Sequence, residues 1–201
     1  MPNKNDEYIP QSGKALTPAG YECNLIEEIT GGAKQILTDH ASIHEGLAYT
    51  VANKMDIAST KVGAISIAVP EGTYVHFKPA KFVNVGGPVY LSLLEDYTFT
   101  GGSAITPVNR KRTGTVGVSA CTVKGSTDIT AVAGSTPVSL DMKVLPGSST
   151  GASHLGGDFG AAEEWILRPG KTYLVTMTNA TSPGAQVTVG YELFWYEEAA
   201  G

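Results

Sequence analysis

Two histidines four positions apart, His40 and His44, are the first candidates for a chemical site. On a helix this spacing places both imidazoles on one face, as in many zinc sites. However, Glu45 follows the second histidine, a glycine interrupts the pattern at once, and the flanking segments 35–38 and 47–52 have the composition of strands. We therefore predict no metal site, and we expect His44 and Glu45 to form hydrogen bonds at a corner between two strands.

A second candidate is the segment 147–151, which satisfies the Gly-x-Ser-x-Gly pattern of hydrolase nucleophile elbows. An elbow requires a following helix and then, further along the chain, an acid and a histidine. Here a glycine-rich segment follows, and His154 is the last histidine. Adjacent glutamates at 163–164 and at 197–198 point to opposite faces of a strand, so neither pair can flank one glycosidic bond. We interpret both pairs as solvated strand ends and predict no catalytic residue and no cofactor.

The charge balance of the chain argues against nucleic acid as a partner. The formal net charge is -5 and the sequence pI is about 5.3, so the chain lacks the positive field that attracts phosphate backbones. The one dense basic cluster, Arg110-Lys111-Arg112, lies between turn signals. A solvated loop explains such a cluster, and contact with an acidic partner surface is the alternative.

The spacing of the cysteines and the lengths of the apolar segments indicate the cellular compartment in which the protein is made. Cys23 and Cys121 belong to no metal-binding or redox spacing, so we predict two reduced cysteines, at least one of them buried as a small apolar group. The first residues lack the apolar region of a secretory signal, and no run approaches the roughly 18 apolar residues of a membrane span. We expect a protein that is made in the cytosol and has no membrane partner.

The elements that position these residues are predicted to be short strands. The chain has 24 glycines and 11 prolines beside only 16% charged residues, which favours many turns and little helix. Segments rich in β-branched and aromatic residues recur between turn signals, as in sandwiches, jelly rolls and barrels. The predicted strands are 35–38, 47–52, 62–69, 73–77, 89–94, 115–123 and 138–144.

Two further strands, 163–179 and 186–196, show the clearest alternation of apolar and polar residues, and the Pro-Gly segment between them is typical of a turn. We predict that they form a closing hairpin. The glycine-rich segment 145–160 is predicted to be a long interface loop. We interpret residues 1–34 as an irregular N-terminal arm and residues 35–201 as one all-β domain.

Several segments, taken together, resemble those of a known family. They are Ile43–Gly46 with Tyr49, Asp56–Ala58, Ala104–Arg112, Glu164–Leu167 with Tyr173 and Leu174, Thr178–Ala180, and Phe194–Glu197. In this set and order they resemble tailed-bacteriophage virion proteins, which are small β-sandwich proteins encoded among the head genes. The resemblance extends from about His40 to Glu197. The basic motif of this family usually reads Asn-Arg-Asn-Arg, and here lysine stands at its third position.

The resemblance implies a jelly-roll-like antiparallel β-sandwich that decorates and stabilises a phage capsid as a cement or decoration protein. The implied location is the outer surface of the head, and the implied partner is the major capsid protein. A homo-oligomer is expected, with a trimer as the first expectation and a dimer as the second. The resemblance carries over no catalytic residue, metal or cofactor.

In this hypothesis the arm anchors on the capsid and a small set of residues meets the shell or a sister subunit. The expected interface residues are Asn109, Arg110, Lys111, Arg112, His44 and Glu45. The alternative function is a receptor- or glycan-binding module of a phage tail fibre or spike. Exposed aromatic side chains such as Tyr74, Tyr97 or Phe159, gathered in a shallow cleft, would favour that alternative.

Overall fold

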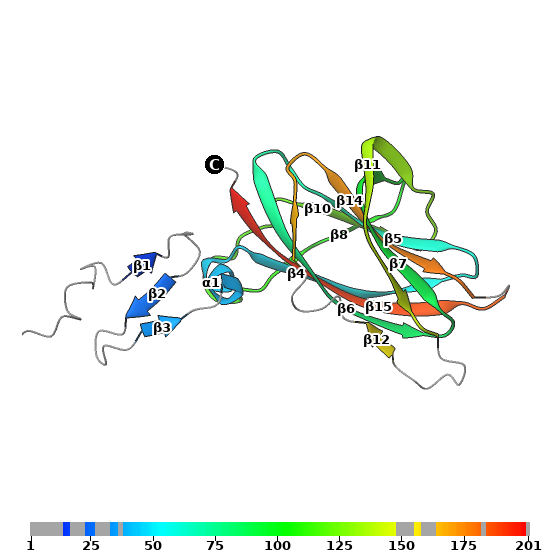
Figure 1. The fold of residues 1–201 in the computed structure, drawn as a ribbon, viewed down its shortest axis with the longest axis horizontal. Coiled ribbons are helices and arrows are strands. Elements are labelled where there is room, and N and C mark those ends of the chain that lie inside the picture. The colour runs from blue at the N-terminus through cyan, green and yellow to red at the C-terminus, as the bar shows by residue number, and fades with distance from the viewer. Residues whose placement is uncertain are drawn as a thin grey trace, which may run out of the picture.

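A computed structural model of the protein describes residues 14–16, 23–26, 33–35, 38–147, 155–157, 164–181 and 184–199. Within these ranges the chain forms one helix, α1 (Thr38–Glu45), and a sandwich of two facing antiparallel sheets (Figure 1). The strands are β1 (Lys14–Leu16), β2 (Cys23–Ile26), β3 (Ala33–Gln35), β4 (Ala48–Ile57), β5 (Val62–Ala68), β6 (Thr73–Val85), β7 (Val89–Thr98), β8 (Ser103–Ile105), β9 (Val108–Asn109), β10 (Thr122–Ser126), β11 (Val132–Leu145), β12 (Leu155–Gly157), β13 (Trp165–Leu167), β14 (Thr172–Asn179) and β15 (Val187–Ala199).

The strand order identifies the sandwich as a jelly roll. One sheet has the order β11-β7-β14-β5-β10-β8, and the other has the order β12-β6-β15-β4-β9, with β13 paired to β6. The pairs are nested, because β4 pairs with β15, β5 with β14, β6 with β12 and β7 with β11. Eight strands that pair in this nested way across two sheets define a jelly roll. The predicted all-β, jelly-roll-like antiparallel sandwich is therefore confirmed.

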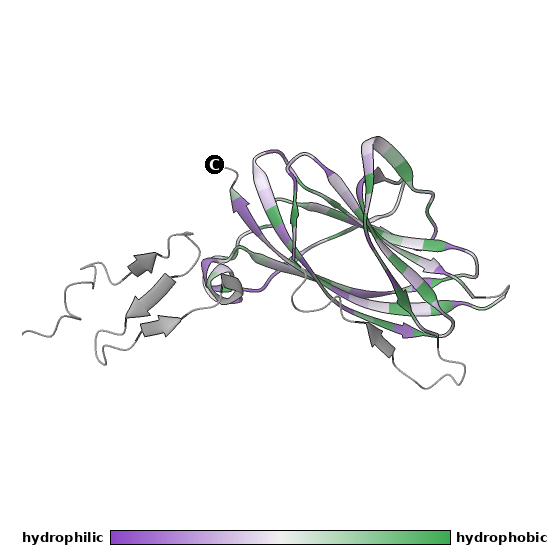
Figure 2. Ribbon diagram, viewed as in Figure 1, coloured by the Kyte–Doolittle hydropathy of each residue, from purple (hydrophilic) through white to green (hydrophobic). Residues whose placement is uncertain are grey.

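The core lies between the two sheets and follows from the alternation of the strands. In β15 every second residue from Val187 to Trp195 is buried and faces the opposite sheet. Figure 2 shows hydrophobic and hydrophilic positions along the strands of both sheets. The outer side of β5 and β14 is also buried, because Phe99 and Ile129 from connecting segments pack over Ala64 and Leu174. Each fully buried large apolar side chain contributes about 1.5 to 3 kcal/mol.

The predicted closing hairpin is wrong, although both of its segments contain strands. β14 lies between β5 and β7 in one sheet, whereas β15 lies between β4 and β6 in the other. The connection between them passes from one sheet to the other. Alternation shows which residues of a strand face the core, but it does not show in which sheet the strand pairs.

Three other local predictions need correction. Thr38 begins α1 and does not end a strand, and in the predicted strand 115–123 only Thr122 and Val123 belong to a strand. β12 lies within the predicted loop 145–160. Segment 115–121 contains β-branched residues, which favour strands, but side-chain hydrogen bonds and not pairing with a neighbouring strand hold part of it in place.

No helix in the described ranges has the length and apolar character needed to cross a membrane.

The described parts of the N-terminal arm are strands. β1, β2 and β3 form a small antiparallel sheet in that order, so the arm is not irregular at these positions. Each of these strands has only three or four residues. Segments of this length are too short to show a reliable period of two in the sequence.

Cys121 is free and buried, which confirms the prediction of a buried, unpaired cysteine. Burial raises the pKa of its thiol far above the usual value, and the nearby Glu197 charge raises it further. Because the thiolate is the reactive form, we expect iodoacetamide to leave Cys121 unmodified in the native protein and to alkylate it after denaturation. A Cys23→Ser variant makes Cys121 the sole reporter, and peptide mass spectrometry measures the labelling. Rapid alkylation of the native protein would contradict this prediction.

Candidate functional site

The six predicted interface residues lie together where α1 ends beside β9. His44 and Glu45 form the last turn of α1, and Asn109 ends β9, which pairs with the start of β4. The amide of Arg110 donates a hydrogen bond to the carbonyl oxygen of Ala48 at 2.9 Å. The structure thus brings residues 44–45 and 109–112 together from distant parts of the sequence.

Asn109 holds this region together and is only 3% exposed. Its side-chain amide donates to the carbonyl oxygens of Gly46 at 2.7 Å and Gly117 at 3.2 Å. Its Oδ1 accepts a hydrogen bond from the amide of Lys111 at 2.8 Å. Asn109 therefore fixes the end of α1, the turn that carries the basic residues and the segment that follows them. Its role is positioning, and its neighbours are the residues that a partner can reach.

The end of α1 has a well-defined local cause. Gly46 has a φ of 81°, its amide donates to the carbonyl of Ile43, and the amide of Leu47 donates to the carbonyl of Ser42. This is a Schellman motif, which needs glycine at the left-handed position. His44 and Glu45 are exposed on the last helical turn, so the prediction that they sit at a corner between two strands is wrong.

The basic residues are presented to solvent from this fixed turn. Arg110 and Arg112 are exposed, and Lys111 is half-buried. The Arg110 guanidinium lies 4.6 Å from the centre of the Phe194 ring, a cation–π contact on the outer face of the sheet. Among the described residues, no acidic side chain forms an ion pair with any of the three. Their charge is thus available to an acidic surface outside the chain.

Beneath α1, the outer face of this sheet carries a small apolar cluster. Ala48, Phe194 and Tyr196 are buried there, and Ile43 of α1 packs against them. Tyr196 also stacks on the His76 imidazole, with ring centres 4.4 Å apart. The helix therefore covers a neighbouring aromatic surface and holds the interface residues at its edge.

Next to this cluster is a group of polar residues that sequence reasoning missed. The carboxylate of Glu164 accepts hydrogen bonds from the Tyr196 hydroxyl at 2.8 Å and lies 2.6 Å from His76 Nδ1. Lys78 Nζ lies 3.2 Å from the other Glu164 oxygen, and Glu198 Oε2 lies 3.4 Å from His76 Nε2. We call these five residues the Glu164 cluster. It ties β13 and the end of β15 to β6, and the single histidine in an alternating strand was its only sequence signal.

Glu164 gives this cluster a pH-dependent contribution to stability. Burial by itself raises the pKa of Glu164, but hydrogen bonds from Tyr196, His76 and Lys78 outweigh burial and hold the pKa below its usual value. A carboxyl whose pKa is lower in the folded state contributes stability that is complete above its unfolded pKa, about 4.3, and is lost as the pH falls through the folded pKa.

We therefore expect Glu164→Gln to lower the free energy of unfolding by about 1 kcal/mol at neutral pH, a modest loss because the group is partly exposed. The difference from wild type should shrink as the pH falls below about 4. Urea unfolding of both proteins at neutral and acid pH measures it. A difference that stays constant across this range would show that the lowered pKa of Glu164 does not contribute.

Glu197 and Glu198 do point to opposite faces, as predicted, but only Glu198 is solvated. Glu197 is 6% exposed, and its carboxylate accepts hydrogen bonds from Ser119 Oγ at 2.5 Å, Ala120 N at 2.9 Å and Trp195 Nε1 at 2.9 Å. The interpretation of Glu197 as a solvated strand end is wrong. It fixes the segment before β10 against β15.

The remaining sequence motifs lie partly outside the residues that the structure describes. Ser148, Ser149 and Glu163 lie outside the described residues. His44 lies on a helix with His40, and not at the predicted corner between two strands. The described residues hold no group of three or more His, Cys, Asp or Glu side chains suited to a metal ion.

Of the aromatic residues that would favour a receptor-binding cleft, the two that the structure describes, Tyr74 and Tyr97, lie in different sheets. Tyr74 is exposed on β6, whereas Tyr97 is partly buried on β7 of the opposite sheet against Phe99 and its neighbours. Phe159 lies outside the described residues.

Comparison with models of known protein families finds no match, and comparison with curated proteins finds no significant match. The resemblance to phage head proteins therefore stays a prediction from sequence motifs. The jelly roll and the arrangement around α1 are the structural findings on which a proposal must rest.

Proposed function

We propose that the protein is a structural virion protein that binds the outer surface of a phage head and stabilises contacts between subunits of the major capsid protein. It acts by binding and not by catalysis. The proposal rests on one observation. Asn109 fixes the turn that presents Arg110 and Arg112 to solvent beside α1, and neither arginine has an acidic partner among the described residues.

The chemistry of this site suits an acidic protein surface. Arginine forms bidentate contacts with carboxylates and loses less freedom on binding when its backbone is already fixed. A fixed cluster of cations also steers association through its field. The chain as a whole carries a net charge of -5, so the basic turn gives the molecule a defined orientation toward an acidic shell.

The arm and the oligomer complete the proposal. Residues 1–34 precede α1 and include β1, β2 and the first two residues of β3, and strands outside a core are suited to adding contacts along a partner. A symmetric homo-oligomer, a trimer first and a dimer second, would bind through several weak contacts at once.

The test is the binding of the purified protein to heads assembled without it. We expect wild type to co-sediment with the heads and an Arg110→Ser/Arg112→Ser variant to bind about tenfold more weakly at low salt. Added salt should weaken wild type more than the variant, because the lost contacts are ionic. Lys124→Ser, which removes an exposed cation on β10, is the matched control and should bind as wild type does.

Two further outcomes decide the proposal. Deleting residues 1–34 should greatly reduce occupancy while circular dichroism still shows a folded sandwich, and full occupancy by this variant would rule out the anchor. Electron cryo-microscopy of virions should show the protein in a regular array on the head. Its presence at the tail tip alone would contradict the proposal and favour a receptor- or glycan-binding module of a tail fibre or spike.

A further inference from the structure

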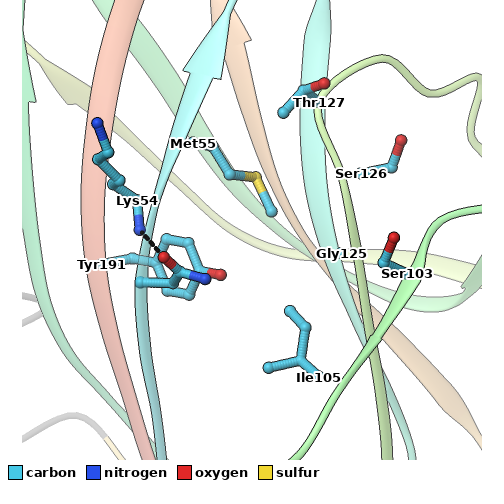
Figure 3. A pocket seen from close by; sticks show the side chains of 9 residues that line it. Lys54, Met55, Ser103, Ile105, Gly125, Ser126, Thr127 and Tyr191 are labelled. Carbon is cyan, nitrogen blue, oxygen red and sulfur yellow. Dashed lines mark hydrogen bonds between the residues drawn. The ribbon is translucent and has the colours of Figure 1, made fainter.

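A pocket of about 180 Å³ opens to solvent between β4 and β15 of one sheet and β8 and β10 of the other (Figure 3). Its volume is below the roughly 300 to 1,000 Å³ of pockets for drug-sized ligands, so it has room for one small ring. It lies apart from α1 and the basic turn, and the capsid proposal does not use it. The lining residues are Asn53, Lys54, Met55, Ser103, Ile105, Gly125, Ser126, Thr127 and Tyr191.

The lining has an apolar floor and a polar rim. Met55 and Tyr191 are buried and Ile105 is half-buried, whereas Asn53, Ser103 and Thr127 at the rim are exposed. The pocket contains no carboxylate, and its one amine, Lys54, lies at the surface 4.0 Å from Asp56. This set of groups favours a neutral ligand with both apolar and hydroxyl surface.

Tyr191 is the group that points to a ligand. The residue is only 5% exposed, yet no hydrogen bond joins its hydroxyl to any other residue that the structure describes. Figure 3 shows the hydroxyl directed toward the space between Met55, Ile105 and Gly125. Burial raises the pKa of Tyr191, so the hydroxyl stays neutral and can both donate and accept. The hydroxyl is reached through the open pocket and has no protein partner among the described residues, so it can pair with a polar group of a ligand.

Gly125 keeps the pocket open. A Cβ atom at this position would lie 2.8 Å from Ile105 Cδ1 and 3.0 Å from Met55 Cε. Both are the ends of flexible side chains, so a methyl group would displace them into the pocket. The space therefore depends on glycine at this position of β10.

We propose that this pocket binds one unit of a neutral carbohydrate, with an apolar face of the sugar ring on Met55 and Ile105 and a sugar hydroxyl paired with Tyr191. Hydroxyl and amide groups at Asn53 and Ser103 bind the hydroxyls at the edge of the ring. An apolar side chain of a partner protein fits less well, because it would cover the Tyr191 hydroxyl without supplying a hydrogen bond.

The experiment is an NMR titration of the ¹⁵N-labelled full chain with glucose, galactose and N-acetylglucosamine, and with cyclohexanol as an apolar ring. A ligand of about twelve non-hydrogen atoms is expected to bind with a millimolar dissociation constant. We expect at least one sugar to shift the amide signals of Met55, Ile105 and Gly125 and to bind more tightly than cyclohexanol. The titration is then repeated with a polysaccharide that contains this sugar. Tighter binding of the polysaccharide would identify a glycan chain, and not the free sugar, as the natural ligand.

Three variants make the result specific. Tyr191→Phe should weaken sugar binding about tenfold without lowering thermal stability, since the hydroxyl has no described protein partner. Gly125→Ala should abolish binding, whereas Gly190→Ala, whose Cβ meets only Val83 at an ordinary 3.9 Å, should bind as wild type does. The proposal is overturned if no sugar shifts these signals, if cyclohexanol binds at least as tightly as every sugar, or if binding is the same in Tyr191→Phe.

Discussion

Replacing Glu197 by alanine is expected to lower the free energy of unfolding by about 3 to 5 kcal/mol. The change removes the acceptor of three hydrogen bonds at a site that is 6% exposed. Ser119 and Ala120 can turn to water, but Trp195 is fully buried, so its indole N–H is left without a partner. The segment before β10 also loses its attachment to β15.

The neighbouring residue supplies the control for this prediction. Glu198→Gln changes a partly exposed carboxylate on the other face of the same strand, which lies 3.4 Å from His76 Nε2, and should cost less than about 1 kcal/mol. Glu197→Gln keeps the shape and one acceptor oxygen and should fall between the two. Urea unfolding followed by tryptophan fluorescence measures all three. Equal stability of Glu197→Ala and Glu198→Gln would show that the buried carboxylate is not a structural anchor.

Replacing Asn109 by alanine is expected to lower the free energy of unfolding by about 2 to 4 kcal/mol and to weaken binding to phage heads. The carbonyl of Gly46 and the amide of Lys111 lose their partner, so the turn that carries the basic residues is no longer fixed beside α1. Binding should fall even though Arg110 and Arg112 are unchanged, because ordering them again costs free energy on association.

Asn179 offers an unusually close control for this second prediction. Its amide donates to the carbonyls of Ile57 and Ala185, and its Oδ1 accepts from the amide of Thr181, the same pattern at the other end of β4. Asn179→Ala should lose similar stability and keep its binding to heads. The two variants are compared by urea unfolding and by co-sedimentation at a temperature where both are folded. Equal loss of binding in both would assign the effect to stability alone.

The sequence alone predicts the fold class well, because apolar and polar residues alternate in β7, β14 and β15 and the turns between strands are marked by Gly and Pro. It does not predict which strands pair, since the jelly roll joins strands that are far apart in the chain. The prediction of a closing hairpin was wrong for this reason. α1 was missed because its eight residues include few strong helix formers, and its stability comes from Ile43 packing on the sheet.

The site could be predicted only in part. The motifs at 43–46 and 109–112 were found separately, and the contact between them depends on the pairing of β9 with β4. The Glu164 cluster and the Tyr191 pocket could not be found, because each joins side chains from segments that are far apart in the chain. Glu197 was misjudged because a carboxylate near a strand end is usually solvated, and only the structure shows the indole and the serine that bury it.

The nested pairing of the strands also bears on how the protein is made. β14 and β15, the last two strands that the structure describes, occupy central positions in the two sheets, so neither sheet can close before these strands have been synthesised. Until then β5 and β7, and likewise β4 and β6, expose the edges that these strands will fill, and exposed strand edges invite aggregation. The sandwich is therefore expected to form in one late step, after β15 has emerged from the ribosome, and a nascent chain that ends before Thr172 should depend on chaperones to stay in solution.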